Sequence, residues 1–150
     1  MSFDRYRIEA ELALGMIPSI EMPKIAWDGL ESGLDGPAIR RLAALEKPTP
    51  FEVAEILPKA SKELGLSNLT VGEASERFTR LRVAEILDKN LDPLLYLKEL
   101  QAIWIKADYP SETQEIGTLY DDIERCADLS EAVIRDWVTK ELQRFLLNSR

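Results

Sequence analysis

Residues that begin and end α-helices recur at short intervals along this chain, and they limit its fold more than any other feature. Thr70 and Glu73 have the spacing of a capping box, in which each side chain satisfies a backbone amide at the helix N-terminus. Asp92-Pro93 is a second start signal, because aspartate caps helices well and proline fits their first turn. Gly65 ends the run before it, since glycine readily adopts the left-handed C-cap conformation. The pattern is typical of short helices joined by tight turns.

These signals divide the chain into helical segments. We expect helices over residues 5–14, 23–33, 38–45, 51–64, 71–87, 93–107 and 119–127, and a last one that begins with the capping box Asp128–Glu131 and includes Phe145. Residues 111–117 are expected to form a loop or a single turn, and Pro58 is expected to kink or split its helix. No run shows the alternation typical of strands. The sequence therefore predicts an all-α fold of seven or eight short helices in antiparallel hairpins, as a bundle or a short α-solenoid-like stack.

The composition fits one globular unit with a real core. With 150 residues and a hydrophobic fraction of 45%, residues 1–150 are expected to form a single domain. Trp104 and Trp137 lie on apolar helical stripes and are expected in its core, whereas Trp27 has the polar neighbours Asp28 and Glu31 and is expected at a boundary.

The residue types that are missing exclude several classes of function. The chain has no histidine and one cysteine, so one chain cannot supply a Ser-His-Asp triad, a Cys-His pair or a zinc site of the usual ligands. An internal disulfide is also impossible, which suits a reducing compartment. No segment has the length of a membrane span or the pattern of a secretory signal, so we expect a cytoplasmic protein that does not enter a membrane.

Negative charge is concentrated in one part of the sequence. Residues 108–136 contain nine acidic and two basic side chains, a formal charge of −7 out of −8 for the whole chain. Part of this excess is explained by helix starts, where acidic residues favour the positive end of the helix dipole. The remainder predicts a surface that docks a basic protein partner. We name this surface the acidic face, and its expected contact residues are Glu112, Glu115, Asp121, Asp122 and Glu124.

Clustered carboxylates also allow a second interpretation, a Mg²⁺-dependent enzyme. Asp121, Asp122 and Glu124 could hold a metal ion only with further ligands from other helices, and the sequence identifies none. The series Asp88, Asn90, Asp92 and Glu99 has the spacing of a calcium-binding EF-hand loop, but Pro93 stands where that loop requires glycine. We therefore predict no cofactor, no bound metal and no catalytic residue, while the enzyme alternative stays open.

A DNA-binding regulator is a third and weaker interpretation. Arg77, Arg80 and Arg82 lie close together after the capping box of Thr70, as a basic helix in a DNA-binding module would require. Glutamates are interleaved with these arginines, however, so the pattern favours ion pairs along an exposed helix. Together with the net charge of −8, this makes nucleic acid an unfavoured partner.

Two stretches resemble a known type of protein. The residues that carry the likeness are Leu14-Gly15-Met16-Ile17-Pro18 with Arg41-Leu42-Ala43-Ala44-Leu45, and Val83-Ala84-Glu85-Ile86-Leu87 with Leu91-Asp92-Pro93. They resemble a family of small, uncharacterised, all-α bacterial cytoplasmic proteins. The resemblance implies an all-α fold and supplies no catalytic residue.

The interpretation that combines these observations is a non-catalytic protein-interaction domain. A small, acidic chain without catalytic motifs has the properties needed to occupy the basic groove of a cationic toxin, as an immunity protein or antitoxin does. Homodimerisation is compatible with each of the three interpretations.

Overall fold

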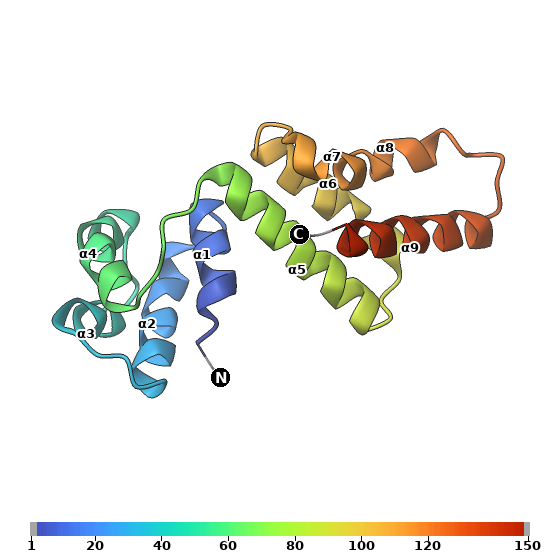
Figure 1. Cartoon of the computed structure of the whole chain (residues 1–150). Coiled ribbons are helices and arrows are strands. Elements are labelled where there is room, and N and C mark those ends of the chain that lie inside the picture. The colour runs from blue at the N-terminus through green and yellow to red at the C-terminus, as the bar shows by residue number, and fades with distance from the viewer. Residues whose placement is uncertain (1–2, 149–150) are drawn as a thin grey trace. The chain divides into compact units, whose positions relative to one another are not determined.

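Helices are the regular elements throughout residues 3–148, the part of the chain that the computed structural model describes (Figure 1). The prediction of an all-α fold is confirmed. No helix within these residues is both long and apolar enough to cross a membrane. The chain divides into two compact units, Met1–Thr70 and Val71–Arg150, which are described separately. The expectation of a single domain over residues 1–150 stays a prediction.

Four α-helices build the first unit, and their ends are where the sequence places them. The helices are α1 (Arg5–Ala13), α2 (Met22–Glu31), α3 (Pro37–Ala43) and α4 (Pro50–Glu63), with a 3-10 turn, η1 (Ser19–Glu21), before α2. Asp4 caps α1 by accepting a hydrogen bond from the Arg7 amide at 3.1 Å. Thr49 and Glu52 form a complete capping box at the start of α4. Gly65 follows α4 with φ +72°, the left-handed conformation expected of a C-terminal stop.

The core of the first unit lies between α2, α3 and α4. Ile39, Leu42 and Leu64 are almost completely buried there. Glu63 of α4 joins two of these helices, because its carboxylate accepts hydrogen bonds from the Ala38 and Ile39 amides at 3.3 and 2.9 Å. It thereby caps α3, whose own N-cap residue is Gly36 and has no side chain to do so.

The second unit contains the remaining helices around a core of its own. They are α5 (Val71–Asp88), α6 (Leu97–Lys106), α7 (Gln114–Gly117), α8 (Leu119–Glu124) and α9 (Glu131–Leu147), with the 3-10 turns η2 (Pro93–Leu95) and η3 (Ser111–Thr113). The core side chains come from all five α-helices, and the largest of them are Ile86, Leu97, Leu100, Ile116, Leu119, Leu142 and Phe145.

Several predicted boundaries in the second unit are wrong. Residues 111–117, expected as a loop or a single turn, form two short helical elements, η3 and α7. Gly117 is the last residue of α7, and a Cβ atom there would lie 2.3 Å from the Trp104 ring, so close packing requires glycine. Thr118 does not cap α8, because its hydroxyl donates a hydrogen bond to the Gln114 carbonyl at 2.9 Å and continues the helical path.

The last helix also begins differently from the prediction. Ser130, and not Asp128, is its N-cap, and the Ser130 hydroxyl accepts a hydrogen bond from the Val133 amide at 3.2 Å. Asp128 lies two residues too early to reach the first free amides. The preceding helix, α8, ends at Glu124 and not at Ala127. Likewise, α6 starts only at Leu97, because Asp92-Pro93 opens the 3-10 turn η2.

The expectations about Pro58 and Trp137 are corrected in part. Pro58 does not split α4, which continues from Pro50 to Glu63, whereas the alternative of a kink stays a prediction. Trp137 is not a core residue, since 38% of its surface is exposed. Trp104 is half-buried, and its indole N–H donates a hydrogen bond to the Pro110 carbonyl at 3.0 Å. Trp27 is 55% exposed, in line with its expected place at a boundary.

Candidate functional site

The residues of the predicted acidic face lie on three successive helical segments of the second unit. Glu112 belongs to η3, Glu115 to α7, and Asp121, Asp122 and Glu124 to α8. All of them are exposed except Asp122, which is half-buried. The segments that carry them are held by Thr113, Ile116 and Leu119, which are buried between these acidic positions. The local sequence thus alternates core residues with carboxylates, and this alternation keeps the carboxylates in solvent.

Four of these five carboxylates are not neutralised within the described residues. Asp122 has an ion pair with Arg125 at 3.7 Å. No ion pair or hydrogen bond joins the side chains of Glu112, Glu115, Asp121 or Glu124 to any residue between 3 and 148. Their negative charge is therefore directed to solvent and not to neighbouring cations.

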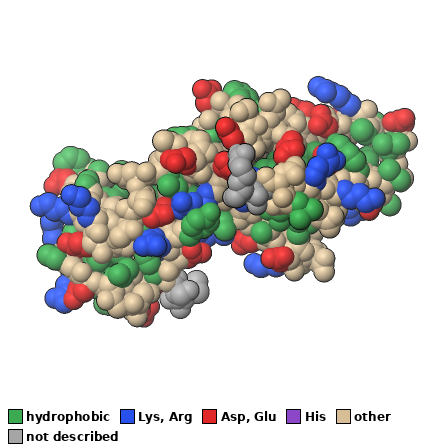
Figure 2. Space-filling model, viewed as in Figure 1, with side chains coloured by type: hydrophobic (Ala, Val, Ile, Leu, Met, Phe, Trp, Pro, Cys, Tyr) green, Lys and Arg blue, Asp and Glu red, His purple; other side chains and the backbone are tan. Residues whose placement is uncertain are grey.

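The other acidic residues of the charged window behave in two ways. Glu131 and Asp136 are neutralised by basic residues of the same helix, α9. Glu131 pairs with Arg135 at 3.0 Å, and Asp136 pairs with Lys140 at 3.1 Å. Asp108 and Asp128 are exposed. On the face drawn in Figure 2, acidic side chains alternate with single lysines and arginines and do not form one continuous patch. The unneutralised charge comes mainly from η3, α7, α8 and the segment after α8.

The carboxylates do not converge on a metal site. Within residues 3–148, no group of three or more Asp, Glu, Cys or His side chains lies close enough together to hold a metal ion. Asp92, the central residue of the EF-hand-like spacing, accepts a hydrogen bond from the Leu94 amide and pairs with Arg135. The magnesium-enzyme alternative therefore rests on the sequence pattern alone.

Two of the three arginines that suggested DNA binding, Arg80 and Arg82, form ion pairs within α5 and with α6. Arg80 pairs with Glu76 at 3.3 Å, and its guanidinium also lies over the Phe145 ring, 4.5 Å from the centroid. Arg82 pairs with Glu99 at 2.6 Å and with Glu85 at 3.3 Å. The prediction of interleaved ion pairs is confirmed for these two arginines.

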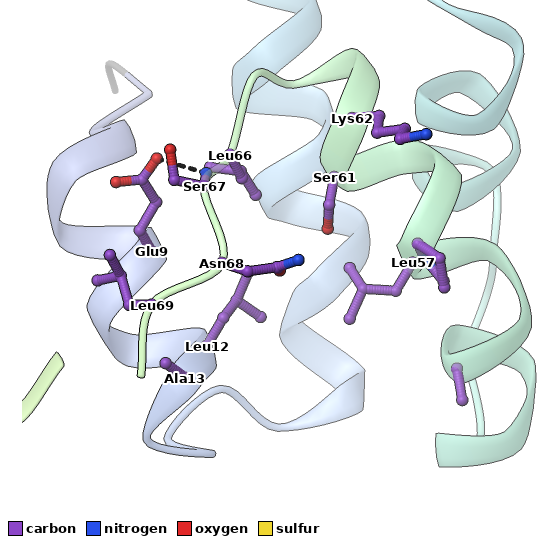
Figure 3. A pocket seen from close by; sticks show the side chains of 12 residues that line it. Glu9, Leu12, Ala13, Leu57, Ser61, Lys62, Leu66, Ser67, Asn68 and Leu69 are labelled. Carbon is purple, nitrogen blue, oxygen red and sulfur yellow. Dashed lines mark hydrogen bonds between the residues drawn. The ribbon is translucent and has the colours of Figure 1, made fainter. Parts of the chain in front are cut away.

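The first unit contains a groove that the sequence does not reveal (Figure 3). It has a volume of about 640 Å³ and lies between α1, α4 and the segment that follows α4. Its apolar wall includes leucines from each of these segments, with Leu12 on α1, Leu57 on α4 and Leu66 after α4. Ser61, Lys62 and Asn68 add polar groups. The groove thus offers apolar surface with a polar border.

The buried carboxylate of this groove has a structural task. Glu9 of α1 is 6% exposed, and it accepts a hydrogen bond from the Ser67 amide at 2.7 Å (Figure 3). It fastens the chain after α4 to α1. The sequence gives no signal for this role of Glu9, because the residue occupies an ordinary helical position and its partner is 58 residues away.

Comparison with known proteins adds no further site. No protein-family model, curated protein or solved structure matches the chain. The resemblance to small, uncharacterised bacterial proteins stays a prediction.

Proposed function

We propose that this chain is a non-catalytic protein-interaction domain, and that its second unit binds a basic protein through the acidic face. The proposed contact residues are Glu112, Glu115, Asp121, Asp122 and Glu124. An immunity or antitoxin-like role is the most concrete form of this function, since an acidic surface can occupy the basic groove of a toxin.

The observation that carries the proposal is that four exposed carboxylates lack an intramolecular partner within residues 3–148. A carboxylate already held in an ion pair must break that pair before it can contact a partner. Glu112, Glu115, Asp121 and Glu124 pay no such cost. Their combined field also attracts a cationic protein from a distance and raises the rate of association, an effect that salt screens.

The test compares three immobilised forms of the chain in a pull-down from native lysate. The first is the unchanged chain, and the second carries Glu112→Lys, Glu115→Lys, Asp121→Lys and Glu124→Lys. The third is a matched control with the same change of net charge, in which four exposed glutamates of the first unit are reversed: Glu21→Lys, Glu31→Lys, Glu46→Lys and Glu55→Lys. Circular dichroism checks that all three remain helical.

We expect the unchanged chain and the control to retain the same basic protein at low salt and to release it at high salt. With that partner purified, the four reversals in the acidic face should reduce the association rate at least about tenfold. Equal binding by the acidic-face variant and the control would contradict the proposal. So would a partner whose retention is independent of salt.

A further inference from the structure

An exposed apolar stripe runs along the beginning of α9 and the residues before it. We define the α9 stripe as Leu129, Val133 and Trp137, whose exposed fractions are 47%, 53% and 38%. A spacing of four residues places successive side chains on one side of a helix, so Val133 and Trp137 share a face of α9. Leu129 lies just before the N-cap Ser130, and Val133 and Trp137 are about 6 Å apart along the helix axis.

The α9 stripe is not needed to fill the core of the second unit. The opposite side of α9 provides that packing, through Val138, Leu142 and Phe145, which are at most 1% exposed. In Figure 2, hydrophobic side chains gather on the part of the second unit where Figure 1 draws the α8–α9 connection. A tryptophan and a β-branched residue are therefore left in solvent on a helix that already has a complete buried face.

Most charges near the α9 stripe in sequence are paired. From Glu124 to Lys140 the chain has four acidic residues, two arginines and one lysine. Lys140, three residues after Trp137, is paired with Asp136 at 3.1 Å. Arg125 is paired with Asp122, and Arg135 with Asp92 and Glu131. Glu124 and Asp128 are exposed and have no ion-pair partner within the described residues. A second copy of the chain would bring like charges to this border, whereas a cationic partner would neutralise them.

We infer that the α9 stripe and the neighbouring acidic residues bind an amphipathic, basic α-helix of the partner protein. Apolar residues of that helix at a spacing of three or four would pack on Val133 and Trp137, and flanking lysines or arginines would face Glu124 and Asp128. A helix fits because side-chain rows on two helices interdigitate. Trp137 supplies the kind of aromatic anchor that dominates protein interfaces. This inference rests on the proposed function and adds the shape and the apolar content of the partner surface.

The probe is a fluorescently labelled synthetic peptide of leucine, lysine and alanine, with leucines along one helical face. A scrambled peptide of the same composition, whose leucines do not align, serves as the first control. Binding to the full chain is followed by fluorescence anisotropy. Trp137→Gln and Val133→Gln test the stripe, and Trp27→Gln is the matched control, because Trp27 is also exposed but lies in the first unit.

We expect the aligned peptide to bind more tightly than the scrambled one, and Trp137→Gln to weaken its binding at least about tenfold. Val133→Gln should weaken binding less, and Trp27→Gln should leave it unchanged. Equal affinity for both peptides, or no effect of Trp137→Gln, would overturn the inference. A chain that is dimeric in sedimentation and becomes monomeric with Trp137→Gln would also overturn it, since a second copy would then cover the stripe.

The four acidic-face reversals separate this inference from the proposed function. If they weaken peptide binding and Trp137→Gln does not, the acidic face is supported and the α9 stripe is not. If Trp137→Gln weakens binding and the reversals do not, the stripe binds an apolar surface and the proposed function fails.

Discussion

The carboxylate of Glu9 accepts a hydrogen bond from the Ser67 backbone amide at 2.7 Å, across 58 residues of sequence. The bond connects α1, the first helix of the first unit, with the segment that follows α4, its last helix. Glu9 is 6% exposed, so hydrogen-bond donors of the protein, among them the Ser67 amide, and not water stabilise its charge. This contact gives the first unit a strong dependence on a single polar side chain.

Replacing Glu9 by alanine should therefore destabilise the first unit. The Ser67 amide would lose its charged acceptor, which typically costs about 1.5–3 kcal/mol. Urea unfolding followed by circular dichroism measures the loss. The control is Glu11→Ala, which removes a part-exposed ion pair with Arg7 (3.2 Å) and should cost less than about 1 kcal/mol. Equal losses in the two variants would show that the Ser67 contact is unimportant.

Gly117→Ala and Gly72→Ala should change stability in opposite directions. A Cβ atom at Gly117 would lie 2.3 Å from the Trp104 ring, so that variant should lose about 1–3 kcal/mol. A Cβ atom at Gly72 in α5 would meet no atom within 4 Å. Alanine there should raise stability by about 0.4–1 kcal/mol, because it restricts the unfolded chain. Thermal unfolding of both variants tests this, and a stable Gly117→Ala would contradict the close packing.

The Asp92–Arg135 pair should make the second unit sensitive to acid. Hydrogen bonds from Arg135, at 3.0 and 3.3 Å, lower the pKa of Asp92 below its ordinary value of 3.8. A carboxyl group with a lowered pKa stabilises the fold above its ordinary pKa, and this contribution is lost as the pH falls through the lowered value. A double-mutant cycle with Asp92→Asn and Arg135→Gln should give a coupling energy that is present at neutral pH and disappears in strong acid. A coupling energy independent of pH would disprove the ionic origin.

Pro58→Ala should stabilise the first unit. Proline has no amide hydrogen, so within α4 it cannot donate the helical hydrogen bond to the Ala54 carbonyl. Pro58 and Ala54 are both exposed, and alanine at position 58 restores the missing donor without disturbing the core. We expect a gain of up to about 3 kcal/mol in the free energy of unfolding. A loss of stability would mean that a bend at Pro58 is required to form the groove.

Local signals predicted the starts of α1, α4 and α5 well. A capping side chain accepts a hydrogen bond from an amide two or three residues away. The starts of α1 and α4 can therefore be predicted from Asp4, Thr49 and the few residues that follow them. Helix ends marked by Gly15 and Gly65 are predictable for the same reason, since the left-handed conformation is a property of one residue.

Tertiary contacts explain the failures. Glycine is required at the last residue of α7, Gly117, because the Trp104 ring occupies the space of a side chain there, and the neighbouring sequence gives no signal of this contact. Trp137 has the spacing of a core residue, but the buried side of α9 is centred on Val138 and Leu142. A one-residue shift around a helix turns a side chain by about 100°, so a prediction from periodicity alone can place it on the wrong face.

The acidic face could be predicted only in part. Counting charges identifies the window over residues 108–136, because charge density is a property of the sequence. Spacing within a helix indicates part of the division into paired and unpaired carboxylates. Glu131 and Asp136 are each followed four positions later by a basic residue and pair with it, whereas Glu124 is followed at that distance by the acid Asp128. The exposure of each carboxylate and the absence of partners from other helices are known only from the structure.

The division of the core into two parts has a consequence for synthesis of the protein. Every residue of the first core lies between Met22 and Leu64, and its packing neighbours extend no further than Leu66. During translation this core can be completed while the second unit is still on the ribosome. A nascent chain would then expose the apolar residues of only one incomplete core at a time. This shortens the period in which a chaperone must bind these residues.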